Sequence, residues 1–272
     1  PTSATITIQV EGNVINFYYT KRTDLSYIVN YYEEGTTTSV HPSKTVDNQT
    51  YLDEVTENAE DVPGYNKVAP TSATITIQVE GNVINFYYTK RTDLSYTVNY
   101  LEKGTDTKLK ESKVVDGQVY LSSVTEEAVD IAGYNKVAPT SATITINVED
   151  NVINFYYTKK TDLQFVVNHL DEETNEVLHT QYVGTATYLD KVYASDYVET
   201  ISGYNYAYAE NEYVVIADPD TNNILNLYYT KRTDLSYTVN YLEKGTNIPV
   251  HQSRTENNQT YLDEVTEEAV DV

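Results

Sequence analysis

Hydrophobic and polar residues alternate along residues 94–100, where the hydrophobic positions are Leu94, Tyr96, Val98 and Tyr100. This period of two is typical of a half-buried β-strand. A turn around Gly104 follows, and the residues near 109–115 then predict a second strand. The sequence therefore predicts that this part of the chain starts with two strands.

The hydrophobic spacing changes over the next stretch, where the apolar positions are Leu121, Val124, Ala128 and Ile131. Residues spaced three or four apart line one face of an α-helix. We therefore expect a short helix over Ser122 to Asp130, which Gly133 ends.

Two more alternating segments follow, at residues 142–148 and 152–158, separated by Glu149-Asp150-Asn151. The same place reads Glu80-Gly81-Asn82 one repeat earlier, which predicts a hairpin turn. The predicted order is β-β-short α-β-β. It favours an α+β, β-rich fold, a small ubiquitin-like β-grasp with the helix packed on one face of a mixed sheet.

This pattern recurs along the chain as a tandem array. Asp-Leu-Ser-Tyr opens at Asp24, Asp93 and Asp234, and Asp-Leu-Gln-Phe stands at Asp162. The predicted divisions are the C-terminal part of a truncated repeat at 1–23, repeats at 24–92 and 93–161, a divergent repeat at 162–233, and the N-terminal part of a truncated repeat at 234–272. A phase starting at Pro1, Pro70 and Pro139 is the alternative.

About three polar residues link each repeat to the next, as Lys90-Arg91-Thr92 does. Such short links predict units stacked end to end as an elongated rod. Both ends of the chain fall inside a repeat, so we expect it to be a piece of a longer protein.

The composition limits the classes of partner that the chain can bind. The formal net charge is −23, with 41 acidic against 18 basic residues, and there is no cysteine. This charge argues against binding nucleic acid or anionic membranes, which need clustered Lys and Arg. No segment approaches the roughly 20 apolar residues of a membrane span, so no membrane insertion is expected.

Three recurring motifs resemble those of a known family: Ser95 to Tyr100, Ile131-Ala132-Gly133-Tyr134, and Val152 to Tyr157. Their order and period are similar to those of MucBP (mucin-binding protein) repeats, found in cell-wall-anchored adhesins of Gram-positive bacteria. The resemblance covers essentially the whole chain. It implies a β-grasp fold, no catalytic residues, an extracellular place on the bacterial cell surface, and adhesion to mucin or other host glycoproteins.

Exposed tyrosines next to amides are candidates for glycan binding, because sugar rings stack on aromatic faces while polar groups bond the hydroxyls. The candidates are Tyr18, Tyr87 and Tyr156, with Asn16, Asn85 and Asn154 beside them. The alternative is that these tyrosines cover the second face of a sheet or pair across strands.

Asp218, Asp220 and Asn222 place oxygen ligands at alternate positions, as the start of a calcium loop does. The segment lacks the following glycine and the distal glutamate of such a loop, and a turn held by Asp and Asn side chains is the alternative. No other cofactor is expected.

Histidine is the first residue to examine for catalysis, and the chain has four. His169 replaces the tyrosine found at Tyr31 and Tyr100, so we expect it at an exposed strand or turn position rather than in a catalytic site. No nucleophile or phosphate-loop motif is present. The chain is therefore not expected to be an enzyme.

Two functions remain. The first is attachment to mucin or host glycoproteins through many weak contacts. The second is a structural stalk that projects a distal binding domain from the cell wall without binding a ligand itself.

Overall fold

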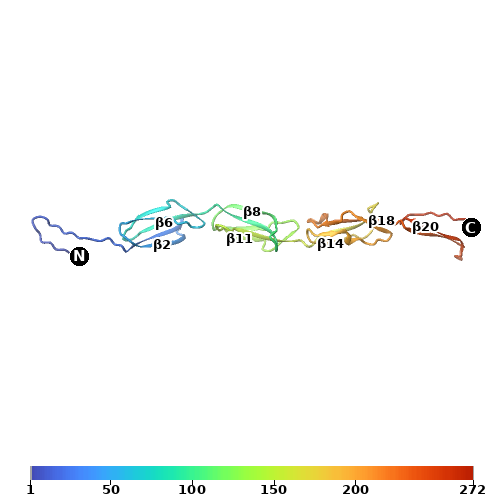
Figure 1. Cartoon of the computed structure of the whole chain (residues 1–272), viewed down its shortest axis with the longest axis horizontal. Coiled ribbons are helices and arrows are strands. Elements are labelled where there is room, and N and C mark those ends of the chain that lie inside the picture. Colours follow the sequence, from blue (N-terminus) through green and yellow to red (C-terminus); the bar gives the residue numbers. More distant parts are fainter. Residues whose placement is uncertain (1, 272) are drawn as a thin grey trace. The chain divides into compact units, whose positions relative to one another are not determined.

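A computed structural model describes residues 2–271, and the fold is nearly all β (Figure 1). Within the described residues, helical structure is confined to the 3-10 turns η1 (Ala194–Tyr197) and η2 (Asp220–Asn222). None of the helices found between residues 2 and 271 has the length and apolar character to cross a membrane.

Residues 25–90 form a four-stranded sheet and a smaller strand pair. The larger sheet has the order β2-β1-β6-β4, from β1 (Leu25–Glu33), β2 (Ser39–Gln49), β4 (Tyr65–Lys67) and β6 (Val83–Lys90). The central strands β1 and β6 are parallel, and the outer strands are antiparallel to them. β3 (Glu54–Asn58) and β5 (Ser72–Thr76) form the antiparallel pair.

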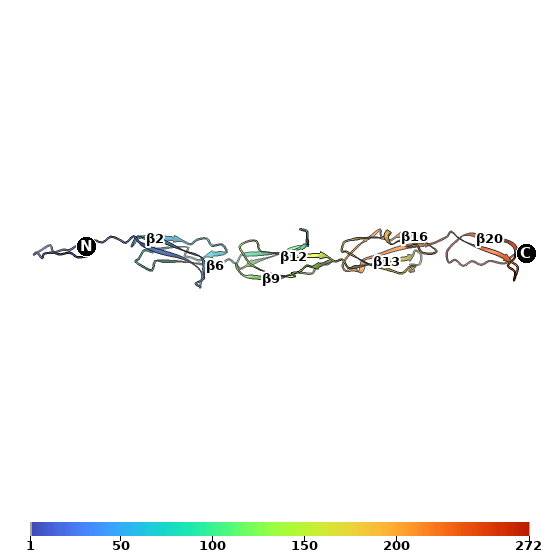
Figure 2. The same cartoon turned by 90° about the horizontal axis from the view of Figure 1, so that it is seen from below.

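The same arrangement recurs over residues 94–159. The larger sheet has the order β10-β12-β7-β8, from β7 (Leu94–Glu102), β8 (Lys108–Gln118), β10 (Tyr134–Lys136) and β12 (Val152–Lys159). The smaller pair joins β9 (Ser123–Glu127), labelled in Figure 2, to β11 (Ser141–Thr145), labelled in Figure 1.

Residues 163–231 repeat it with one shorter edge strand, β14, and one longer edge strand, β16. The larger sheet has the order β14-β13-β18-β16, from β13 (Leu163–Asp171), β14 (Tyr182–Ala186), β16 (Tyr204–Ala209) and β18 (Ile224–Lys231). β15 (Lys191–Tyr193) pairs with β17 (Tyr213–Val215). The last strands, β19 (Leu235–Leu242) and β20 (Pro249–Gln259), pair with each other.

The chain divides into two compact units. One holds Pro1–Asn99, Glu111–Glu127 and Ser141–Asn154, and the other holds Tyr100–Lys110, Ala128–Thr140 and Phe155–Val272. Each four-stranded sheet includes the long strand that opens with the recurring Asp-Leu motif and the Tyr-Tyr strand near the end of the same predicted repeat.

The core of the first sheet lies on the inner face of its parallel strands. Val29, Ile84 and Phe86 are buried there, as alternation in a strand requires. Tyr88 is fully buried, and its hydroxyl donates a hydrogen bond to the carbonyl of Glu60 at 2.8 Å. Burial raises the pKa of Tyr88 to about 12. Tyrosine therefore serves as a core residue here, with its polar tip satisfied by the backbone.

The predicted helix over Ser122 to Asp130 is wrong, and with it the α+β, ubiquitin-like β-grasp. The segment contains β9, an extended strand (Figure 2). Leu121 has a left-handed backbone with φ 62°, and its N–H donates to the carbonyl of Ile146 at 2.8 Å. These backbone groups are used across the sheet pair, so no i to i+4 helical ladder starts here.

The predicted hairpin between residues 142–148 and 152–158 is also wrong. β11 pairs with β9, whereas β12 lies next to β10 and β7 in the larger sheet. The polar turn therefore carries the chain from one sheet to another. Turn chemistry fixes where the chain reverses, but not which strands pair afterwards.

Candidate functional site

The outer face of the sheet β2-β1-β6-β4 carries a row of amide and tyrosine side chains. The parallel register sets Asn30 opposite Asn85 and Tyr32 opposite Tyr87. Asn30 Nδ2 donates to Asn85 Oδ1 at 3.0 Å, and Ser43 Oγ donates to Asn30 Oδ1 at 2.7 Å. The row thus crosses three strands on the face opposite the core.

The candidates Asn85 and Tyr87 lie together on this face. The ring of Tyr87 is 41% exposed, and its centroid lies 6.5 Å from that of Tyr32. Asn85 uses its Oδ1 in this hydrogen bond, and its Nδ2 donates to no other residue in the described part of the chain. An aromatic face beside an available amide donor can stack on a sugar ring and bond a hydroxyl.

The same arrangement occurs around the candidates Asn154 and Tyr156. Asn154 Oδ1 accepts a hydrogen bond from Asn99 Nδ2 at 2.9 Å, and Asn99 Oδ1 accepts one from Ser112 Oγ at 2.7 Å. Tyr156 follows two residues later on β12, so it shares the face of Asn154, and it is 41% exposed. An exposed ring on a sheet face suits weak binding.

Asn16 and Tyr18 are placed differently. Tyr18 is 86% exposed, and residues 2–24 form no strand in the described structure. The local turn of this segment is still present, since Asn13 Nδ2 donates to the carbonyl of Gln9 at 2.7 Å. These two candidates therefore have no neighbouring strand beside them to complete an amide row.

The third sheet carries a variant of the row that the sequence reasoning missed. Asn168 Nδ2 donates to Asn226 Oδ1 at 2.8 Å, and Asn226 Nδ2 donates to the carboxylate of Glu210 at 2.8 Å. Tyr208 and Tyr228 stack with centroids 5.1 Å apart. An asparagine at the same place in every repeat was the available signal. Here Glu210 takes up the amide donor that Asn85 and Asn154 leave available.

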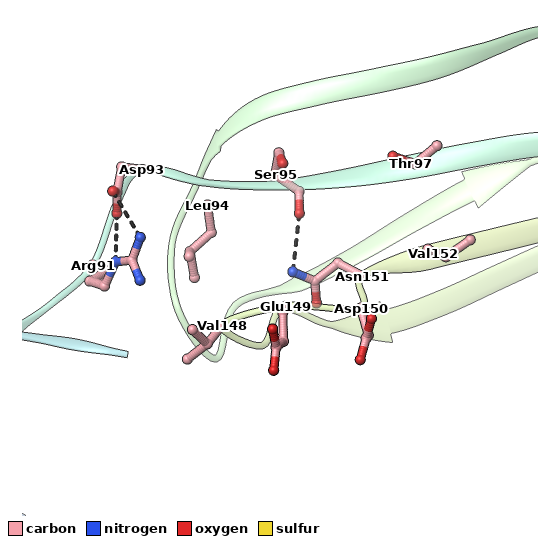
Figure 3. A pocket seen from close by; sticks show the side chains of 10 residues that line it. All are labelled: Arg91, Asp93, Leu94, Ser95, Thr97, Val148, Glu149, Asp150, Asn151 and Val152. Carbon is pink, nitrogen blue, oxygen red and sulfur yellow. Dashed lines mark hydrogen bonds and ion pairs between the residues drawn. The ribbon is translucent and has the colours of Figure 1, made fainter. Parts of the chain in front are cut away.

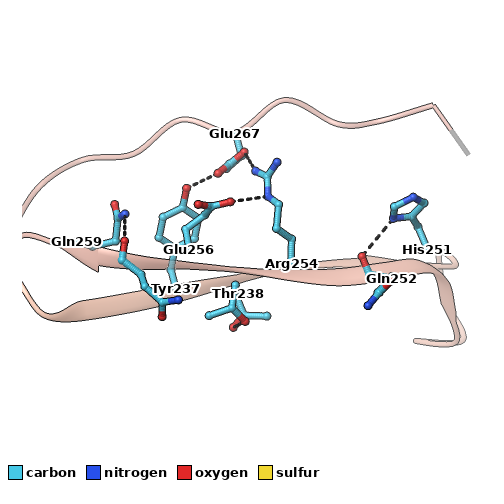
Figure 4. A network of polar contacts seen from close by, with 10 residues as sticks. Tyr237, Thr238, His251, Gln252, Arg254, Glu256, Gln259 and Glu267 are labelled. Carbon is cyan, nitrogen blue, oxygen red and sulfur yellow. Dashed lines mark hydrogen bonds and ion pairs between the residues drawn. The ribbon is translucent and has the colours of Figure 1, made fainter.

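A second recurring cluster, near the strand edges, joins an acid to a tyrosine and a base. Glu57 accepts hydrogen bonds from Lys44 Nζ at 2.8 Å and from the Tyr27 hydroxyl at 2.6 Å. The bond from Lys44, followed by that from Tyr27, holds the pKa of Glu57 below its ordinary value. Figure 4 shows the corresponding cluster, in which Glu267 contacts Tyr237 and Arg254. In both clusters the tyrosine hydroxyl and the basic side chain bond the glutamate, which indicates a structural role.

A polar pocket of about 370 Å³ lies at the turn between β11 and β12 (Figure 3). Asn151 Nδ2 donates to the carbonyl of Ser95 at 3.0 Å and so ties the turn to β7. At the other end, Arg91 pairs with Asp93 at 2.9 Å, and this hydrogen bond lowers the pKa of the Asp93 carboxyl. Arg91 with Asp93 and Asn151 with Ser95 therefore have structural roles at this pocket.

The two acidic calcium candidates accept hydrogen bonds from different partners. The Asp218 carboxylate accepts hydrogen bonds from Lys160 Nζ at 2.7 Å and from the N–H of Gly133 at 2.8 Å. Asp220 Oδ2 accepts instead from the N–H of Gln164 at 3.3 Å, and Asn222 ends the turn η2. Between residues 2 and 271, no group of three or more His, Cys, Asp or Glu residues is arranged to hold a metal ion.

The expected exposure of His169 is wrong. Its side chain is only 2% exposed, because it occupies the inward position of β13 between Asn168 and Leu170. His41 and His179 are exposed, as expected of strand or turn positions. Replacement of a tyrosine points to an exposed position only where the tyrosine itself is exposed, and Tyr31 and Tyr100 are both buried.

Neither a family model nor a curated protein matches this chain. Among solved structures it is similar to a type 2 repeat of the mucus binding protein MUB from Lactobacillus reuteri. That match has 13% sequence identity, covers 50% of this chain and 99% of the other, and has a TM-score of 0.19.

Proposed function

We propose that this chain is the repeat region of a bacterial cell-surface adhesin. It contributes to attachment to mucin or other host glycoproteins through many weak contacts, outside the cell, and it has no catalytic activity. The observation that carries the proposal is the exposed tyrosine beside an amide donor, which occurs both at Asn85 and Tyr87 and at Asn154 and Tyr156. The MucBP-like motifs support the same role.

Weak contacts of this kind act together. A flat face with one ring and one amide offers little affinity by itself, but several faces on one chain raise the effective concentration of each for a multivalent glycoprotein. Linking several contacts in this way raises the overall affinity by about 10² to 10⁴ over that of a single contact. Mucin-type ligands, which present many glycans on one chain, suit this mode.

The test is binding of the full chain to a mucin-coated sensor surface. Replacing Tyr87 and Tyr156 together by Ser removes both stacking faces, and we expect the retained signal to fall by tenfold or more. Tyr193→Ser is the matched control, because Tyr193 is 40% exposed but lies on the smaller sheet, beside Tyr213. Equal losses in the two variants would contradict the proposal.

A structural stalk is the second candidate, and the net charge of −23 favours it. An acidic surface resists non-specific adhesion. If this role is the true one, the unmodified chain shows no retention on mucin at any salt concentration, whereas the adhesin proposal requires measurable retention.

A further inference from the structure

A pocket of about 250 Å³ opens beside β13 in the divergent stretch 162–233. Its lining includes His169, His179, Tyr182, Tyr197 and Glu199. Pockets for drug-sized ligands start at roughly 300 Å³, so this one suits a single small ring. It is separate from the outer-face row of asparagines, since His169 points to the inner side of the sheet.

Smaller side chains and a shorter strand open this pocket. His169 lies opposite Leu227 in the register, where the first sheet pairs Tyr31 with Phe86. Both replacements remove volume from a position that is otherwise packed with stacked aromatic rings. The edge strand β14 has 5 residues, whereas β2 has 11, so the edge next to His169 is left without a continuous strand.

His169, which lines the pocket, has one unpaired acceptor. Its Nε2 lies 2.9 Å from the carbonyl oxygen of Tyr197, and because a carbonyl only accepts, Nε2 carries the proton. The other ring nitrogen, Nδ1, is then a bare acceptor, and it is buried with no hydrogen-bond partner in the described part of the chain. A buried acceptor left unpaired is unfavourable, so a ligand hydroxyl or amide N–H that reaches it is favoured.

Two tyrosines form an aromatic wall beside this acceptor. The rings of Tyr182 and Tyr197 lie 5.0 Å apart at 46°, and Tyr182 is 46% exposed. Tyr182 pairs with Val167 where Lys44 pairs with Val29 in the first sheet. An ion-pairing position in the first sheet is therefore aromatic here, and a partly exposed aromatic face is what a sugar ring stacks on.

The remaining groups select for an uncharged ligand. Glu199 is one of the lining residues, and its negative charge repels an anionic sugar, as does the chain's net charge of −23. The exposed ring of His179 packs edge-on against His169 at 5.4 Å. Exposed side chains change rotamer in picoseconds to nanoseconds. We therefore expect the His179 side chain to turn away from His169 when a ligand enters.

We propose that this pocket binds a single uncharged sugar residue, with its ring on Tyr182 and one of its hydroxyls donating to His169 Nδ1. The inference rests on the adhesin function proposed above and deepens it, since it assigns one repeat a defined sugar site in addition to the open faces. The repeats at 24–92 and 93–161 have Tyr31 and Tyr100 at this place and lack the acceptor.

The four histidines provide a direct test, because histidine-selective isotope labelling of the full chain gives one set of ring signals for each. The probes are methyl β-galactoside, N-acetylglucosamine, N-acetylgalactosamine and fucose, with sialic acid as the anionic control. We expect at least one neutral sugar to shift the ring signals of His169 and His179 saturably, while His41 and His251 stay unchanged. Equal shifts of all four, or none with any neutral sugar at tens of millimolar, overturn the proposal.

Two variants restore the residues of the neighbouring repeats and should therefore fold. His169→Tyr removes the acceptor and fills the pocket, and Tyr182→Lys removes the aromatic wall. We expect each to weaken sugar binding by tenfold or more, read from the His179 signal. Unchanged affinity for the sugar in both variants overturns the proposal that this pocket is the binding site.

Retention of the same 272-residue chain on mucin separates the two proposals. Retention without a His169 response refutes the pocket and leaves the adhesin function in place. A saturable His169 response without retention on mucin refutes the adhesin function and leaves the sugar site.

Discussion

At the scale of single residues, one glutamate in each of the first two repeats joins a tyrosine to a lysine. The side chain of Glu57 is only 13% exposed, and the bond from Lys44 keeps its pKa below the ordinary value. Glu126 has the same position and the same direction of shift, caused first by Lys113 and then by Tyr96. A carboxyl whose pKa is lowered by folding stabilises the folded state only while it is ionised.

Replacing both acids, Glu57→Gln with Glu126→Gln, should lower the free energy of unfolding at pH 7 by about 1–2 kcal/mol per site, since the bonds are charge-assisted but partly screened. This stabilisation is full above the unfolded-state pKa of about 4.3 and is lost as the pH falls through the lower folded-state pKa. Urea unfolding between pH 7 and pH 2 measures the difference, which should vanish at the acid end.

The control is Glu54→Gln with Glu127→Gln, which removes the same charge from exposed positions on β3 and β9. It should change stability by less than about 0.5 kcal/mol. A matching loss in the control would assign the effect to net charge rather than to the hydrogen bonds.

Gly64 is required for two reasons. Its φ is +82°, and a Cβ built on it would lie 2.4 Å from the ring of Tyr120. That ring packs edge-on against Tyr65, with centroids 5.4 Å apart at 77°. The contact recurs between Gly133 and Tyr188, and between Gly203 and Tyr261.

Gly64→Ala should therefore destabilise the chain by about 1–3 kcal/mol more than Gly104→Ala. Gly104 has nearly the same φ, +83°, but open space around it, so it reports the backbone cost alone. Unfolding free energies of both variants, repeated in a Tyr120→Ala background, complete a double-mutant cycle. If Tyr120→Ala leaves the difference between the two glycines unchanged, the ring contact is not its cause.

At the scale of the elements, one asparagine fixes the crossing from the small sheet to the large one. Asn82 is 9% exposed; its Nδ2 donates to the carbonyls of Gln78 at 2.8 Å and Ser26 at 3.0 Å, and its Oδ1 accepts from the Gln78 N–H at 2.8 Å. The bond to Ser26 links the turn to the start of β1. Asn13 bonds Gln9 in the same local way.

Asn82→Asp should cost about 2–3 kcal/mol of unfolding free energy, because a carboxylate keeps the acceptor but leaves the two carbonyls without a donor. Asn13→Asp is the matched control, since Asn13 lies in an exposed segment that forms no strand, and we expect no change in global unfolding there. Amide hydrogen exchange on β1 and β6 gives a local readout. Unchanged protection in the Asn82→Asp variant would contradict the role assigned to this side chain.

The strands also show where sequence periodicity is enough to predict secondary structure. Alternation at Leu94 to Tyr100 predicts a strand, and β7 is there, because a strand buried on one face must alternate. Val124 and Ala128 fit a helical spacing as well as a strand next to a loop. The left-handed backbone at Leu121 and its hydrogen bond to Ile146 favour the strand over the helix. That bond is a long-range feature that no local pattern records.

In the candidate site, too, local pattern accounts for some features and long-range contacts for others. Asn85 and Tyr87 alternate with the buried residues Ile84, Phe86 and Tyr88 on β6, so both lie on its exposed face. Their partners Asn30 and Tyr32 lie far away in the sequence and are brought alongside by the parallel register, which no local pattern specifies. The pocket at His169 was missed because its burial depends on Leu227 and on the interruption of β14.

At the scale of the whole molecule, charge opposes the proposed function. The chain has a formal net charge of −23, and sialylated or sulfated mucin is also anionic. At about 10 mM salt the Debye length is roughly 30 Å, so repulsion acts before the Asn and Tyr faces touch a glycan. At about 150 mM it falls to roughly 8 Å, and short-range stacking and hydrogen bonds then act with little opposition.

Retention of the chain on sialylated mucin should therefore rise several-fold as salt increases from about 10 mM to about 150 mM, because each of several linked contacts is relieved of repulsion. On the same mucin after enzymatic removal of sialic acid, retention should be higher at low salt and should depend less on ionic strength. Both are measured on sensor surfaces with the full chain. A steady fall in retention with rising salt would mean that charge attraction drives binding, and the uncharged faces at Asn85 and Asn154 could then not be the contact surface.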